Sequence, residues 1–121
     1  MNSESIEQQR TVLFIESHLL ENSLHKELVY AIPNGGKRHI SVAKQLKNEG
    51  VKKGVFDLFV GLPCHGYHGL YIEMKRQKGG RVSKEQKIFK KIFEEQGYCC
   101  IICRGFDQAS KMFMQYINGE L

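Results

Sequence analysis

The stretch Gly54-Val55-Phe56-Asp57-Leu58-Phe59-Val60 has the composition of a buried β-strand, yet it contains a charged residue. A second stretch of this kind follows it: Gly69-Leu70-Tyr71-Ile72-Glu73-Met74-Lys75. Residues 61–69 between them are polar and rich in turn formers, which predicts a β-hairpin with strands over 55–60 and 70–75. Because side chains alternate between the two faces of a strand, Glu73 and Lys75 should share one face and Met74 the other.

If Asp57 lies beside this strand, two carboxylates and one ammonium group converge at one place. Burying such charges costs several kcal/mol each unless they are paired or bind a metal. Two carboxylates form a hard-oxygen site suited to Mg²⁺ or Mn²⁺, and a metal beside a lysine can activate water and stabilise a phosphate. The alternative is an edge hairpin with a solvated charged face. The apolar residues between the charges disfavour it.

The remaining elements follow from periodicity and capping signals. Helices are expected over residues 4–20, 41–48, 83–96 and 107–117, and strands over 28–32 and 98–103 in addition to the hairpin. The first helix is indicated by the helical spacing of apolar side chains, namely Ile6, Leu13, Phe14, Leu19 and Leu20. The order α-β-α-β-β-α-β-α predicts an α/β fold, a mixed central sheet flanked by helices on both faces.

Length and composition limit the possible classes of protein. The chain has 121 residues, which predicts a single domain over residues 1–121. It contains no apolar run near the ~20 residues that span a bilayer, so no membrane association is expected. The polar start of the sequence is unlike a secretory signal, so the four cysteines are expected to be reduced thiols. The net charge of +5 favours a polyanionic partner.

Five motifs together resemble a known family. They are Ile32-Pro33-Asn34-Gly35-Gly36-Lys37-Arg38, the run from Leu46 to Asp57, the run from Gly69 to Lys75, Ser83-Lys84-Glu85-Gln86, and Glu95-Gln96-Gly97-Tyr98. In this order they resemble the PD-(D/E)XK nuclease superfamily, and in detail its VRR-NUC branch, the virus-type replication-repair nucleases. The resemblance covers nearly the whole chain, from about Glu7 to Ile117. One position departs from it, because Phe56 stands where the family usually has proline before the aspartate.

The resemblance implies a role for each residue of the hairpin motif. Asp57 and Glu73 would be the metal ligands, joined by the backbone carbonyl of Met74. Lys75 would orient the attacking water or help to take its proton, for which its pKa would need to be lowered by nearby metal charge. A restriction-endonuclease-like PD-(D/E)XK fold is implied with these roles.

Two further residues match the family's site from the flanking helices. Gln86 matches a glutamine that positions water or Lys75, and it also completes a capping box with Ser83, so both roles can hold. Glu7 matches the acidic residue of the first helix. Glu7 is preferred because it lies on the helical face that also presents Phe14, and Glu4, one helical turn away, is the alternative.

The basic residues gather in two glycine-containing segments, where backbone and long side chains can approach phosphates. The predicted DNA-binding residues are Lys37 and Arg38, followed by Arg76, Lys78, Arg81 and Lys84. A solvated charge run is the alternative for each of them. The pairs Cys100-x-x-Cys103 and Cys64-His65-x-x-His68 also suggest zinc, but strand positions three apart face opposite sides, so Cys100 and Cys103 are better placed to pack in the core.

These observations predict a Mg²⁺- or Mn²⁺-dependent DNA endonuclease, located in the cytoplasm of a bacterial or phage-infected cell. A small stand-alone member of this family would act as a homodimer that resolves four-way (Holliday) junctions. A flap, nick or single-strand nuclease, or an inactive DNA-binding module, are the alternatives. The final helix carries four apolar residues near its end that either form the dimer interface or close the core: Met112, Phe113, Tyr116 and Ile117.

Overall fold

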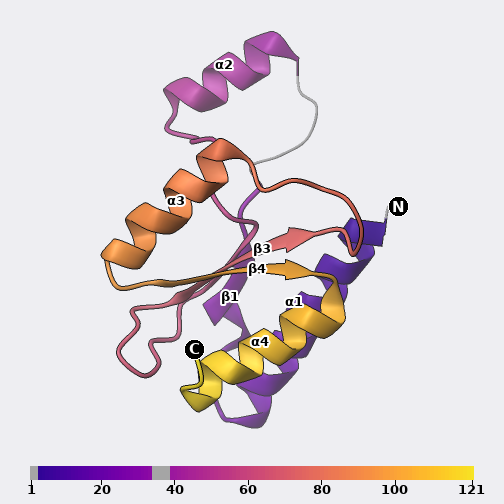
Figure 1. Ribbon diagram of the computed structural model, residues 1–121, viewed down its shortest axis with the longest axis vertical. Coiled ribbons are helices and arrows are strands. Elements are labelled where there is room, and N and C mark those ends of the chain that lie inside the picture. Colours follow the sequence, from indigo (N-terminus) through magenta and orange to yellow (C-terminus); the bar gives the residue numbers. More distant parts are fainter. Residues whose placement is uncertain (1–2, 34–38) are drawn as a thin grey trace.

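The computed structural model describes residues 3–33 and 39–121, and in these ranges four α-helices surround a four-stranded sheet (Figure 1). The helices are α1 (Ser3–Glu21), α2 (Ile40–Asn48), α3 (Lys84–Glu95) and α4 (Phe106–Asn118). The strands are β1 (Val29–Ala31), β2 (Leu58–Val60), β3 (Leu70–Lys75) and β4 (Cys99–Arg104). A short 3₁₀ helix, η1 (Lys26–Leu28), precedes β1 and was not predicted. The order of the α-helices and strands is the predicted one.

The sheet is mixed, as predicted, with the strand order β1-β2-β3-β4. The pairs β1–β2 and β2–β3 are antiparallel, and β3–β4 is parallel, so α3 is the crossover that a parallel pair needs. In the hairpin Leu58 lies opposite Ile72 and Val60 opposite Leu70. The parallel pair places Arg104 beside Lys75, at the end of both strands.

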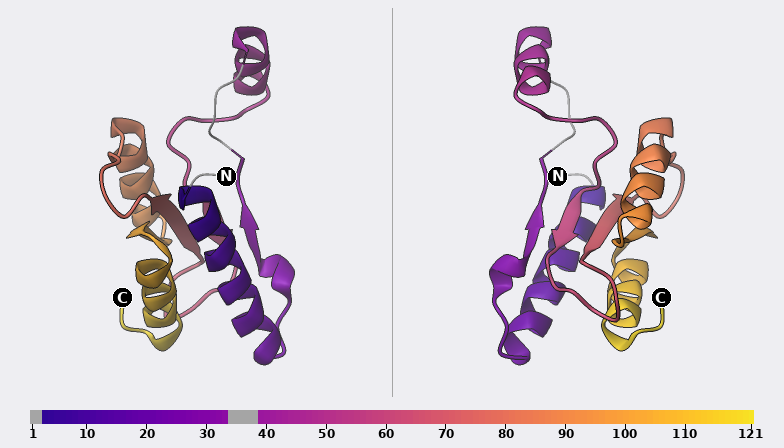
Figure 2. Two further views of the ribbon diagram at one scale, coloured as in Figure 1. Left: turned by 90° about the vertical axis from the view of Figure 1, so that its right-hand side faces the viewer. Right: turned by 90° about the vertical axis from the view of Figure 1, so that its left-hand side faces the viewer.

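The two faces of the sheet are covered by different helices (Figure 2). Helices α1 and α4 pack on one face, where Leu70, Ile72 and Met74 of β3 are fully buried. Helix α3 packs on the other face, where Tyr71 lies among Phe89 and Phe93 with ring centroids about 5 Å apart. Since Glu73 and Lys75 alternate with the first set, they lie on the α3 face, as the hairpin pattern predicts.

Strand β2 is shorter than predicted and begins at Leu58, so Asp57 directly precedes it. The backbone N–H of Ile32 still donates to the Asp57 carbonyl at 2.7 Å, but Pro33 has no N–H with which to continue the ladder. Phe56 leaves the sheet and is fully buried beneath α3, with its ring centroid 5.0 Å from that of Phe89. The residue that departs from the family pattern therefore fills the core under α3.

The buried side of α1 agrees only in part with the predicted apolar spacing, since Leu19 is buried and Phe14 packs against the core while the other predicted residues are exposed. Ile6, Leu13 and Leu20 are 46%, 63% and 58% exposed, and the helix instead buries a stripe at i, i+4 spacing: Thr11, Ile15 and Leu19. Thr11 can be buried because its hydroxyl donates to a carbonyl one turn earlier at 2.8 Å. Because one member of the buried stripe is polar, a search for apolar spacing does not find the whole stripe.

The apolar end of α4 closes the core, which confirms the second of its two interpretations. Phe113 and Tyr116 are buried, and the Tyr116 hydroxyl donates to the Leu62 carbonyl at 2.6 Å. Met112 and Ile117 pack against the same cluster. Met112 and Ile117 are only partly buried, so a dimer interface that includes them stays a prediction.

Helix α2 projects from one end of the molecule and buries none of its residues (Figures 1 and 2). His39 caps it, since its side chain accepts a hydrogen bond from the Ser41 N–H. Among the described residues, no helix combines the length and apolar character needed to cross a membrane.

Candidate active site

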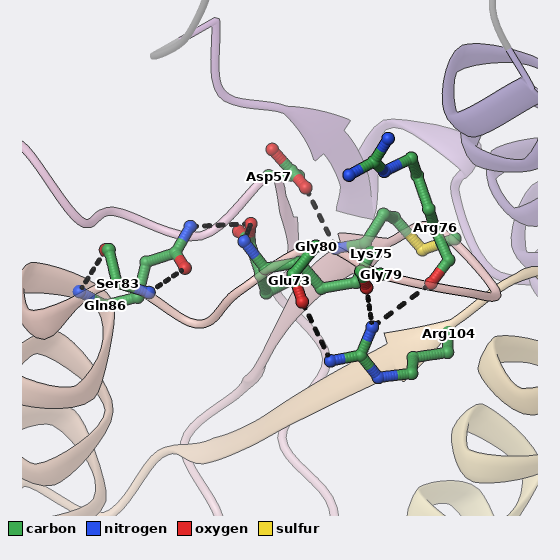
Figure 3. A network of polar contacts seen from close by, with 10 residues as sticks. Asp57, Glu73, Lys75, Arg76, Gly79, Gly80, Ser83, Gln86 and Arg104 are labelled. Atoms are coloured by element: carbon green, nitrogen blue, oxygen red, sulfur yellow. Dashed lines mark hydrogen bonds and ion pairs between the residues drawn. The ribbon is translucent and has the colours of Figure 1, made fainter.

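Asp57, directly before β2, lies near Glu73 of the neighbouring strand β3 (Figure 3). The backbone N–H of Met74 donates to Asp57 Oδ2 at 2.9 Å, which holds this carboxylate against β3. The N–H and C=O of one residue in an extended strand point to the same side, so the Met74 carbonyl faces the side of Asp57 as well. The predicted convergence of the two carboxylates is confirmed.

Glu73 is almost completely buried, and its two oxygens have different surroundings. Oε2 accepts a hydrogen bond from Gln86 Nε2 at 2.7 Å and lies 3.4 Å from the ammonium nitrogen of Lys75. The Glu73 and Lys75 side chains are only 5% and 13% exposed. Oε1 is buried and has no hydrogen-bond partner among the residues that the structure describes. A buried carboxylate oxygen without a partner is costly, which makes this atom a candidate ligand for a cation.

The electrostatics of the pair also favour a cation. Burial and, to a smaller extent, the neighbouring Asp57 charge raise the pKa of Glu73 to about 7, against the opposing effect of Lys75. Burial likewise raises the pKa of Asp57, against the lowering effect of the hydrogen bond from Met74. One lysine therefore does not compensate for the buried Glu73 carboxylate and the half-buried Asp57 carboxylate together.

These residues fit a hard divalent cation. Two carboxylates and a backbone carbonyl offer oxygen ligands, and Mg²⁺ commonly combines one or two carboxylates with retained waters. Within residues 3–33 and 39–121, no three His, Cys, Asp or Glu side chains gather into a metal-binding group. A cation held here would thus rely on backbone and water for its other ligands. When bound, it would lower the pKa of a coordinated water and offset the charge of a phosphate.

The cysteines do not support the zinc alternative. Cys100 packs on the α3 face and Cys103 in the cluster under α1 and α4, as the strand alternation predicts. Burial raises the pKa of both thiols to about 12, in keeping with cysteines packed in the core.

Gln86 has both of the interactions that its sequence position suggests. Its Oε1 accepts from the Ser83 N–H at 3.0 Å, and its own N–H donates to Ser83 Oγ at 3.0 Å, which completes the capping box of α3. Because the cap occupies the amide oxygen, the amide nitrogen is directed at Glu73. The cap of α3 and the orientation of the Glu73 carboxylate are thereby coupled.

The structure separates the two acidic candidates on α1. Glu4 is close enough to Asp57 for its charge to raise the pKa of that carboxyl group. Glu4 also lines a polar pocket together with Lys75 and Arg76. Glu7, the residue favoured by the sequence pattern, instead accepts a hydrogen bond from Gln77 Nε2 at 2.9 Å. The geometry therefore favours Glu4 as the α1 carboxylate that faces the pair.

The predicted DNA-binding residues fall into two groups. Arg76, Lys78, Arg81 and Lys84 are exposed in and after the glycine loop that follows β3. Lys37 and Arg38 lie outside the described residues. Sequence reasoning missed Arg104, whose guanidinium contacts the glycine loop (Figure 3). The parallel pairing of β3 and β4 is the signal that places it there, but it becomes visible only once the strands are paired.

Comparisons with known proteins agree with this geometry. The family model of the VRR-NUC domain matches residues 4–107. A solved structure described as a VRR_NUC domain protein superimposes with a TM-score of 0.78 at 23% sequence identity, covering 98% of this chain and 90% of that chain. A search of curated proteins found no significant match. The fold is thus that of VRR-NUC nucleases, and the extent of the match shows that the chain belongs to the VRR-NUC family.

Proposed function

We propose that this protein is a Mg²⁺- or Mn²⁺-dependent DNA endonuclease that hydrolyses phosphodiester bonds. One observation carries the proposal: the half-buried Asp57 and the buried Glu73 lie close together beside Lys75, with Glu73 Oε1 left without a partner in the described structure. An inactive DNA-binding module would have no need for so costly an arrangement. Family membership supports the coarser statement of a nuclease-type domain.

The roles follow from where each group lies. Asp57, Glu73 and the Met74 carbonyl would hold the cation, which supplies an activated water and charge compensation for the phosphate. Lys75, held 3.4 Å from Glu73, orients the attacking water and assists its deprotonation. Gln86 acts through Glu73, because its amide fixes one carboxylate oxygen and leaves the other for the cation.

We further propose branched DNA as the substrate, a homodimer as the active form, and the cytoplasm as the location. The exposed basic residues around the glycine loop support a polyanionic partner. Resolving a four-way junction needs two symmetric cuts, and a twofold dimer supplies two sites in a fixed relation. Ile6, Leu13 and Leu20 on α1 offer exposed apolar surface for a second copy.

The proposal is tested by incubating the protein with a panel of DNAs: four-way junctions, flaps, nicked duplexes, linear duplexes and single strands. Cleavage is expected in Mg²⁺ or Mn²⁺ and not in EDTA, with four-way junctions cut fastest and in symmetric pairs. No cleavage of any substrate with either metal would contradict the nuclease proposal. If flaps or single strands are cut faster than junctions, the nuclease proposal stands and the proposed preference for four-way junctions is wrong.

Light scattering at micromolar protein tests the assembly. A mass of twice 13.9 kDa is expected for the homodimer. A monomer that also cuts linear ends faster than junctions would overturn the junction-resolving form of the proposal and leave the metal-dependent cleavage in place.

The two acidic residues of α1 should respond differently to neutralisation. Glu4→Gln removes a charge that acts on Asp57 and should lower the cleavage rate several-fold and raise the metal concentration needed for half-maximal rate. Glu7→Gln keeps an acceptor for Gln77 and should have a smaller effect on both quantities. A metal titration of the initial rate measures them. The reverse order of effects would restore Glu7 as the α1 carboxylate of the site.

A further inference from the structure

Arg104 ties the glycine loop to the end of the sheet. Its Nη1 donates to the carbonyls of Arg76, at 3.2 Å, and Gly79, and its Nη2 donates to the carbonyl of Gly80 at 3.2 Å (Figure 3). The guanidinium is rigid and planar, so three acceptors from one loop fix the path of that loop. Arg104 itself is half-buried beside Lys75 at the end of the parallel pair.

These three contacts determine where the loop's amides point. In a trans peptide the C=O of one residue and the N–H of the next are directed to opposite sides. When the carbonyls of residues 76, 79 and 80 turn towards Arg104, the N–H groups of Gln77, Gly80 and Arg81 turn away from it. Within the described part of the chain, none of these three N–H groups has a hydrogen-bond acceptor.

The loop is held in this shape from a second side. The Gln77 side chain donates to Glu7 on α1, and the N–H of Gly105 donates to the Lys75 carbonyl at 3.2 Å. Gly79 and Gly80 have φ of +72° and +71°, a left-handed conformation that glycine adopts without strain. The contacts from α1 and β4 thus set the shape before a ligand binds.

The surroundings of the amides suit an anion. Arg76, Lys78 and Arg81 project from the same loop and are exposed. A polar pocket of about 360 Å³ lies beside it, lined by Ser3, Glu4, Lys75, Arg76 and Gly80, so the loop borders the catalytic lysine. Outward amides flanked by cationic side chains form a binding site for phosphate oxygens.

We propose that residues 77–81 bind a phosphate of the DNA backbone next to the scissile one, and that Arg104 is the positioning residue of this loop. Three of the five N–H donors of Arg104 are engaged by the loop carbonyls, so its role in this proposal is to hold the loop. The inference rests on the proposed DNA substrate and adds a residue and a set of backbone groups that bind it. It predicts that the affinity for DNA depends on the three hydrogen bonds of the Arg104 guanidinium and not on its charge alone.

The first test needs no substitution. A ¹⁵N-labelled sample is titrated with a short DNA duplex in EDTA, and the amide resonances are followed. The resonances of Gln77, Gly80 and Arg81 are expected to move in proportion to bound DNA. If the protein binds DNA while these three resonances stay in place, the loop site is wrong. This titration does not depend on cleavage. A protein whose loop amides respond to DNA here, but which cuts no DNA in Mg²⁺ or Mn²⁺, would overturn the nuclease proposal alone.

The second test separates geometry from charge. Arg104→Lys keeps the charge but loses the three-acceptor fork, and Arg104→Met loses both. Both are expected to weaken DNA binding about tenfold or more, the scale of lost charge-assisted contacts, and to abolish the shifts of the loop amides. Lys111→Met, which removes an exposed charge on α4, is the matched control and should bind nearly as the parent does.

Thermal unfolding of each variant checks that the fold is kept, and fluorescence anisotropy measures the affinity. Arg104→Lys binding as tightly as the parent, with the loop amides still responding, would show that charge alone matters and overturn the positioning role. If Arg104→Met does not fold, Arg104→Lys still tests the positioning role of Arg104, and the titration of the parent protein still tests the loop site.

Discussion

Asp57→Asn is expected to lower the rate of DNA cleavage about 10²-fold or more while leaving DNA binding close to that of the parent. The change keeps an oxygen that can accept the hydrogen bond from the Met74 N–H, so the end of the hairpin should stay in place. It removes the negative charge that a divalent cation requires. Binding survives because phosphate contacts elsewhere supply most of the affinity.

The other members of the site should behave as one unit with Asp57. Lys75→Met and Glu73→Gln are each expected to cost about 10²-fold in rate, and the double variants should cost little more than the single ones, since the groups act together. Single-turnover cleavage measures the rate, and anisotropy in EDTA measures binding. Asp107→Asn removes an exposed carboxylate from α4 and serves as the matched control. A purified Asp57→Asn protein that cuts as fast as this control would show that the carboxylate pair is not the active site.

The hairpin and its site were predictable because their pattern is local. Alternation along β3 requires Glu73 and Lys75 to share a face, and the apolar neighbours require that face to be buried. The capping box of α3 is equally local, and it already places Gln86 one turn into the helix. Each of these inferences needs only a few residues of sequence and one rule of geometry.

The errors arose where long-range packing decides. The choice between Glu4 and Glu7 depends on how α1 lies across the sheet, and both residues occupy the same side of that helix. The buried stripe of α1 contains Thr11, so the apolar pattern identified Leu19 in this stripe but also included the exposed Ile6, Leu13 and Leu20. Arg104 lies 24 to 28 residues from the carbonyls that it contacts, and no local signal connects them.

The second large effect concerns stability and pH. Glu73 has a pKa of about 7 in the folded protein, raised from 4.5 mainly by burial and by Asp57. A raised carboxyl pKa means that the folded state holds the proton more tightly than the unfolded state. The stability that this provides is fully present below about pH 4.5 and is lost as the pH rises through about 7. At about 1.4 kcal/mol per pH unit, the loss is on the order of 3 kcal/mol in metal-free buffer.

Urea unfolding in EDTA measures this loss as a fall in the free energy of unfolding between about pH 4.5 and about pH 7, the window set by the shift. Glu73→Gln is the matched control, because the amide is similar in shape and does not titrate. Its free energy of unfolding should fall less over the same window and exceed that of the parent at the alkaline end. A parent and a variant with parallel pH profiles would show that Glu73 is ionised in the folded protein at neutral pH.

Glu73→Gln also distinguishes the effect of a bound cation on stability from the effect of the proton on Glu73. A divalent cation at about 100 times its dissociation constant should stabilise the parent by about 2.7 kcal/mol, since it binds only the folded state. The gain should be larger at alkaline than at acidic pH, because the cation competes with the proton on Glu73. Glu73→Gln should lose most of it. Equal stabilisation of parent and variant by Mn²⁺ would place the cation away from Glu73, whatever the cleavage assay shows.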